Sequence, residues 1–85
     1  MALQTFTVDP NLVPNVPWPT AQSGTLNAWR KAVHKMLAKA LGHPEEALRY
    51  VDWSEEGGEY WFRKQDGSHV MACFNPPNGL TVQDD

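Results

Sequence analysis

The chain has 85 residues, which is below the length at which proteins divide into several domains, so residues 1–85 should form a single domain around one core. Its 41% hydrophobic and 11% aromatic content excludes an intrinsically disordered chain, because the aromatic residues supply a large burial area. The net charge of −3 argues against bulk electrostatic attraction to nucleic acid.

The amino terminus has neither the basic start nor the apolar run of a signal peptide. No apolar run approaches the ~18 residues that a membrane span needs. Cys73 is the single cysteine, so an internal disulfide is excluded and a reducing compartment is expected. The sequence therefore predicts a cytoplasmic protein that does not associate with membranes.

Residues 4–8 alternate polar and apolar side chains of β-favouring types, which predicts a short strand with Phe6 and Val8 on one face. Residues 9–22 then form a proline-rich arm that precedes a globular body of residues 23–85. Because prolines fix φ and remove backbone donors, the arm should run extended.

The arm carries the apolar side chains Val13, Val16 and Trp18, which are unusual in an inert linker. It should therefore lie on a surface. Two alternatives stay open at this stage. The arm folds back over Trp61 and closes the domain's own core, or it lies on a partner.

The strongest local pattern is at residues 25–41, where apolar residues recur at steps of three and four, as on one side of an α-helix. Ser23 or Thr25 can cap the start of this helix, and Gly42 stands where a left-handed C-cap is expected. The apolar stripe consists of Leu26, Trp29, Val33, Met36, Leu37, Ala40 and Leu41.

Residues 44–50 have the features of a second helix start, with Pro44 at the first helical position and acidic residues in the first turn. The alternative is a strand that runs from Leu48 to Trp53. We expect the helix.

Residues 59–64 and 68–75 predict a β-hairpin around Gln65-Asp66-Gly67. A two-residue turn would leave both faces heavily apolar, whereas a three-residue loop with Gly67 left-handed separates the polarities, so we expect the three-residue loop. One face would then carry Tyr60, Phe62, Val70, Ala72 and Phe74, and the other Glu59, Trp61, Arg63, His69, Met71 and Cys73.

A last short edge strand is predicted at residues 80–82. The fold class is therefore α+β. One long helix (25–41) and a short second helix (44–50) should pack on an antiparallel sheet of three or four strands at residues 4–8, 59–64, 68–75 and 80–82.

No side chains are spaced for catalysis or for metal binding. Cys73 and His69 share a strand face, but four strand residues span ~13 Å, far beyond the ~3 Å that a nucleophile and its base need. His34, His43 and His69 lack metal-ligand spacing. We expect no enzymatic activity, no metal and no cofactor.

Trp61 and Arg63 are residue types that dominate binding hot spots, and a Trp on the second face of a sheet has to be covered. Together with Val13, Val16 and Trp18 of the arm they form the predicted partner-binding site. The expected function is a small non-enzymatic protein-binding module, either an accessory assembly subunit or a stoichiometric inhibitor of a larger protein.

The alternative function depends on charge. Residues 25–43 carry four basic and no acidic side chains, whereas residues 44–85 carry nine acidic and three basic ones. The basic helix face, Arg30, Lys31, Lys35 and Lys39, is the alternative site, for nucleic acid or another anionic surface. Because no aromatic side chains are interleaved with these cations, a protein partner remains the leading hypothesis.

Overall fold

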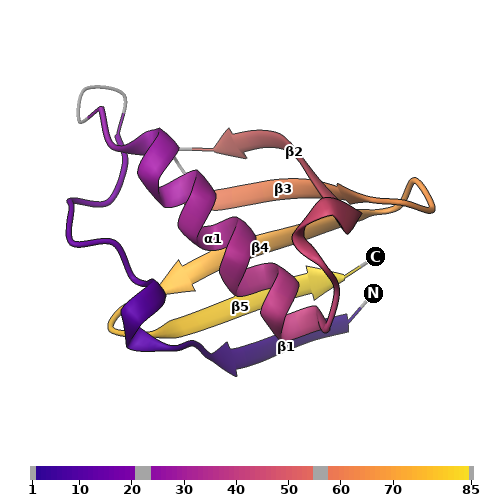
Figure 1. Ribbon diagram of the computed structural model, residues 1–85, viewed down its shortest axis with the longest axis horizontal. Helices are drawn as coiled ribbons and strands as arrows, with labels where there is room; N and C mark the ends of the chain where they lie inside the picture. Colours follow the sequence, from indigo (N-terminus) through magenta and orange to yellow (C-terminus); the bar gives the residue numbers. More distant parts are fainter. Residues whose placement is uncertain (1, 21–23, 55–57, 85) are drawn as a thin grey trace.

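The computed structural model describes residues 2–20, 24–54 and 58–84. In this part of the chain the helix α1 (Leu26–Leu41) crosses one face of a five-stranded antiparallel sheet, whose strand order is β1-β5-β4-β3-β2 (Figure 1). The strands are β1 (Ala2–Thr7), β2 (Leu48–Ser54), β3 (Glu59–Lys64), β4 (His69–Asn75) and β5 (Gly79–Asp84). The predicted α+β class is confirmed, with one strand more than the largest number expected.

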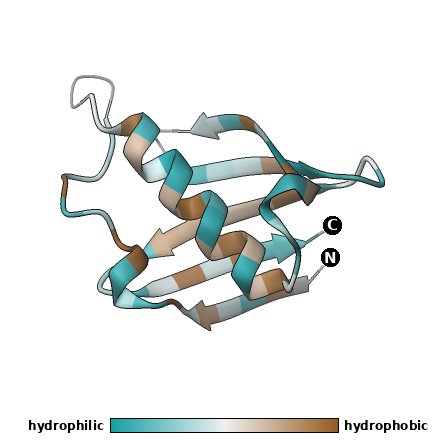
Figure 2. Ribbon diagram, viewed as in Figure 1, coloured by the Kyte–Doolittle hydropathy of each residue, from teal (hydrophilic) through white to brown (hydrophobic). Residues whose placement is uncertain are grey.

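The helix α1 forms at the residues where the apolar periodicity predicts it. Hydrophobic and hydrophilic bands alternate along α1 (Figure 2), and its side chains Val33 and Leu37 are 0% exposed against the sheet. Gly42 ends the helix at φ 72°, and its N–H donates to the last-turn carbonyls. Of the two predicted caps, Ser23 lies outside the described residues. Thr25 occupies the N-cap position, but its hydroxyl donates to the Pro17 carbonyl at 2.8 Å.

The hairpin of β3 and β4 has the predicted three-residue loop. The Lys64 N–H donates to the Ser68 carbonyl at 2.8 Å, and Gly67 has φ 90°, in the left-handed region that a residue with a Cβ rarely adopts. Phe62 consequently pairs with Val70, and both are fully buried. The predicted division of the hairpin into an apolar and a mixed face is confirmed.

The predicted helix at residues 44–50 is wrong. A single 3₁₀ turn, η2 (Glu45–Ala47), follows Pro44, and the chain then enters β2, which is the strand that the sequence left as the alternative. Pairing with β3 explains the difference, because it brings Leu48, Tyr50 and Trp53 to the core, which a short helix would not. The local helix-start signal therefore yields to the tertiary pairing.

The C-terminal strand is longer and more central than the predicted edge strand at 80–82. β5 lies between β1 and β4, with Leu80 and Val82 fully buried, so the two sheet edges are β1 and β2. β1 starts two residues before the predicted 4–8. Its residue Phe6 packs against the core, as does Val8 just beyond the strand.

The proline-rich arm lies on the core of its own domain. Its described residues, 9–20, contain one 3₁₀ turn, η1 (Pro10–Leu12), and otherwise neither helix nor strand. Farther along the arm, the Trp18 ring packs edge to face on Trp29 with centroids 4.8 Å apart, and Trp29 Nε1 donates to the Pro17 carbonyl at 2.9 Å. The described part of the arm thus packs on the helix side of the sheet, which differs from both alternatives left open by the sequence, cover of Trp61 or of a partner.

Most buried side chains of the described residues form one apolar cluster between α1, the arm and the sheet, while Met71, 7% exposed, is buried on the opposite face. Because α1 lies on one face only, the fold leaves the second face of the sheet to the outside (Figure 1). Among the described residues, no helix is long and apolar enough to cross a membrane.

Candidate functional site

The second face of the sheet is the candidate site. The described helices and the arm pack on the opposite side, and within the described ranges no helix or loop lies over this second face, which we call the open face. Side chains alternate along a strand, so β3 presents Glu59, Trp61 and Arg63 there. Trp61 is partly exposed and Arg63 is exposed. The predicted site residues on β3 thus share one accessible surface.

Strand register arranges the open face in rows across the sheet. Trp61 lies opposite Met71, Met71 lies opposite Gln83, and Gln83 lies opposite Leu3 at the β1 edge. Asp52 lies opposite Trp61 at the β2 edge. We call this set the tryptophan row. Leu3 is 70% exposed at the β1 edge and Trp61 is partly exposed, whereas Met71 between them is 7% exposed.

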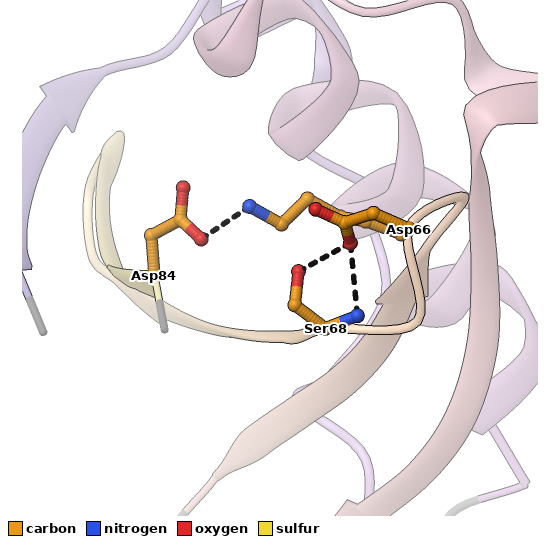
Figure 3. Close-up of polar contacts among 4 residues, drawn as sticks. Asp66, Ser68 and Asp84 are labelled. Atoms are coloured by element: carbon orange, nitrogen blue, oxygen red, sulfur yellow. Dashed lines mark hydrogen bonds and ion pairs between the residues drawn. The ribbon is translucent and has the colours of Figure 1, made fainter.

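The neighbouring row is cationic. Arg49 on β2 lies directly opposite Arg63 on β3, which lies opposite His69 on β4. Like charges that face each other destabilise a sheet, so this cationic row does not contribute to folding. In the described part of the chain no carboxylate forms an ion pair with either arginine, while Lys64 pairs with Asp84 at 2.5 Å (Figure 3). The cationic row is therefore suited to an acidic group on a partner.

On the other side of the tryptophan row, Glu59 lies directly opposite Cys73. Partial burial, and secondarily the charge of Glu59, raise the pKa of the Cys73 thiol. The thiol is therefore protonated at neutral pH, which is the unreactive form. His69 lies on the same strand four residues away, so the geometry again disfavours a thiolate–imidazole pair.

Two hollows open near the hairpin loop. One, of about 190 Å³, is lined by Ala47, Arg49, Arg63, Lys64 and Gln65. The other, of about 340 Å³, is lined by His43, Ala47, Lys64, Gln65 and Asp66. Among the described residues no group of three or more metal-binding side chains occurs.

The Asp66 carboxylate stabilises the hairpin loop. It accepts hydrogen bonds from the Ser68 hydroxyl at 2.6 Å and from the Ser68 N–H at 2.9 Å (Figure 3). These bonds lower the pKa of Asp66. The carboxylate is thus occupied by its own loop. Lys64 and His43 line the adjoining hollow with it, and the nearby charge of Lys64 lowers the pKa of Asp66 further.

The predicted arm residues are not brought to the open face. Trp18 and Val13 are partly buried and pack against the core on the helix side. Val16 is 40% exposed, and its carbonyl accepts a hydrogen bond from Trp29 Nε1 at 3.3 Å. The five residues predicted as one site therefore lie on two sides of the sheet.

The basic helix face is divided. Arg30 lies over the Tyr50 ring, 5.2 Å from its centroid, and is partly buried there. Lys31, Lys35 and Lys39 are exposed at four-residue spacing. Lys35 and Lys39 line a hollow of about 400 Å³ together with Leu12, Ala38, His43, Pro44 and Glu45.

No protein-family model matches the chain, and searches of the curated proteins and of the solved structures found no match.

The sequence missed Arg49 as a member of the site because residues 44–50 were interpreted as a helix. The signal was present in the alternative strand, where Arg49 alternates with Leu48 and Tyr50 and so falls on the opposite face. Leu3 was missed because the position of β1 beside β5 depends on contacts between the two ends of the chain.

Proposed function

We propose that this protein is a non-enzymatic protein-binding module, an accessory subunit of a protein assembly, and that it binds through the open face. The observation that supports the proposal is the juxtaposition of the tryptophan row and the cationic row on an accessible sheet face. Tryptophan and arginine are enriched among residues that dominate binding energy.

The proposal narrows the binding surface that the sequence suggested. Because Trp18 packs on Trp29, the arm contributes to the core, and Trp61 and Arg63 remain as the contact residues. Inhibition of a larger protein is compatible with the same surface. We also propose the cytoplasm as the compartment, since a reducing environment keeps Cys73 as a thiol.

The test uses tagged wild-type protein, Trp61→Ser, and Asn27→Ser as a matched control at an exposed position of α1. Each is purified from the native source, and retained proteins, including untagged copies of the chain, are quantified by mass spectrometry. We expect at least one protein to be retained by wild type and control and to fall at least tenfold with Trp61→Ser. Identical retention by all three would contradict the proposal. Circular dichroism checks that each variant folds.

A second candidate is an anion-binding surface on α1, favoured by the exposed lysines and by the hollow that Lys35 and Lys39 line. It predicts binding of a labelled single-stranded oligonucleotide that weakens linearly with the logarithm of salt concentration, because each neutralised phosphate releases counterions. The double variant Lys35→Glu/Lys39→Glu should abolish it. Absence of binding at low salt excludes this candidate.

A further inference from the structure

From the charge pattern of the open face we infer that the protein partner is a second copy of this chain, and that two sheets stack through their open faces with antiparallel β3 strands. The inference rests on the proposed function and names the occupant of the same surface. It begins with the order of the open-face residues on β3, which is acidic Glu59, aromatic Trp61 and basic Arg63.

This order is self-complementary. Same-face residues on a strand are ~6.6 Å apart, so Glu59 and Arg63 lie at similar distances on either side of Trp61. A two-fold axis that runs along the tryptophan row between the two sheets would reverse the direction of β3. It would place Arg63 of each copy over Glu59 of the other and bring the two Trp61 rings together. Contacts of this kind are those of a closed, isologous dimer.

The charges also select between the two face-to-face arrangements. A two-fold axis parallel to the strands would place the cationic row of one copy over the cationic row of the other. The arginines of the two copies would then lie close to one another, which is unfavourable across an interface. Only the axis along the tryptophan row pairs opposite charges on β3, while Asp52 lies at the rim, where solvent screens it.

The size of the face is close to the minimum for a dimer interface. Strands ~4.8 Å apart and ~3.3 Å per residue give five strands a face of roughly 24 Å by 20 Å, or about 500 Å² per copy. Two copies would bury about 1,000 Å², an area typical of a weak, concentration-dependent dimer. Met71 and Trp61 lie on the axis row within the sheet, where an interface is driest, whereas Leu3, like Asp52, lies at a sheet edge.

The first experiment measures the mass of the purified chain by sedimentation equilibrium between about 1 μM and 500 μM. A chain of 9.6 kDa should shift to twice that mass as concentration rises. A monomer throughout this range overturns the inference. The proposed function would survive that result, because the open face would then bind a different protein, which the Trp61→Ser comparison detects.

The second experiment tests the pairing of Glu59 with Arg63. Glu59→Arg and Arg63→Glu should each raise the dissociation constant at least tenfold, because each makes both cross-interface contacts repulsive. Mixing the two variants should restore a one-to-one heterodimer. The Glu59→Arg variant has basic side chains at positions 59 and 63, the Arg63→Glu variant has acidic ones at both, and the two sets attract each other. Glu46→Arg, at an exposed position of η2, is the charge-reversal control and should leave the dimer intact. A dimer that neither substitution weakens, or a mixture that stays monomeric, overturns the inference.

Discussion

Trp29 of the helix donates its indole N–H to the carbonyl of Pro17 in the arm, 2.9 Å away, and the next arm residue, Trp18, packs on the same ring. The arm lacks backbone pairing to a strand at this point, so these side-chain contacts hold it in place. Trp18 also stacks on Phe74, with centroids 6.2 Å apart. The prolines limit the conformations of the unfolded arm, which lowers the entropic cost of docking it. The arm is therefore part of the folded unit.

Replacing Trp18 by alanine should destabilise the fold. The substitution removes the ring that contacts Trp29, Tyr60 and Phe74, and we expect a loss of about 3 kcal/mol in the free energy of unfolding. Urea denaturation followed by circular dichroism measures it. Val16→Ala, at a 40% exposed position of the same arm, should change stability by less than about 0.5 kcal/mol. Equal stability of Trp18→Ala and wild type would show that the arm does not support the core.

The elements predicted correctly are those whose patterns are local. The apolar periodicity and Gly42 predict the helix, and the polarity of the two faces together with Gly67 predicts the hairpin. β2 could not be chosen over a helix in this way, because Pro44 and the acidic residues after it are a genuine helix-start signal that lasts one turn. What extends the chain beyond Leu48 is pairing with a strand that comes later in the sequence.

The reliance on local patterns also explains which residues of the candidate site could be predicted. Trp61 and Arg63 could be placed on the mixed face because hairpin register follows from the loop. The destination of Trp18 could not be predicted, since a proline-rich segment carries no periodic signal, and both alternatives for the arm were consistent with its composition. Leu3 joins the tryptophan row only because β1 pairs with β5 at the far end of the chain.

Tyr60→Phe should keep or raise stability, by up to about 1 kcal/mol. Tyr60 is 0% exposed and its hydroxyl has no hydrogen-bond partner. Folding therefore removes the hydroxyl from water without a replacing hydrogen bond, and phenylalanine avoids this desolvation cost. Thermal unfolding measures it. Phe62→Ala on the same strand removes a core ring and should cost about 3–5 kcal/mol. A loss above about 1 kcal/mol for Tyr60→Phe would show that the hydroxyl is bonded.

The alkaline response of the same residue gives a separate prediction. Burial, and secondarily Tyr50, raise the pKa of Tyr60 above its ordinary value of 10.0. The stability that the neutral Tyr60 side chain contributes is then fully present below pH 10. It is lost as the pH rises, because the Tyr60 hydroxyl ionises at a lower pH in the unfolded chain than in the native state. Tyr60→Phe should therefore lose less stability than wild type between pH 9 and pH 11. Parallel pH profiles would contradict this expectation.

Asp66 should make the stability of the hairpin depend on acid. The two Ser68 hydrogen bonds lower the pKa of Asp66. The stability that the ionised carboxylate contributes is therefore present above the ordinary aspartate pKa, and it is lost as the pH falls through the lowered pKa. We expect Asp66→Asn to lower the melting temperature at pH 7 and to flatten the decline of melting temperature between pH 5 and pH 2. Ser68→Ala, which removes only the 2.6 Å bond from the hydroxyl, should have an intermediate effect. An unchanged acid profile in both variants would argue against these bonds.

The Cys73 thiol should react slowly with iodoacetamide, and its reactivity should report on the open face. Burial raises its pKa, and Glu59 directly opposite adds to the effect, so the midpoint of the alkylation rate should lie above the ordinary thiol value of 9.0. Glu59→Gln should lower that midpoint and speed alkylation at pH 8, because the neighbouring negative charge is gone. Glu45→Gln, on η2, is the matched control and should change neither. The rates are compared at a protein concentration at which the chain is monomeric, and again in denaturant, where wild type and Glu59→Gln should become alike. Equal midpoints in the folded and denatured protein would show that the open face does not perturb the thiol.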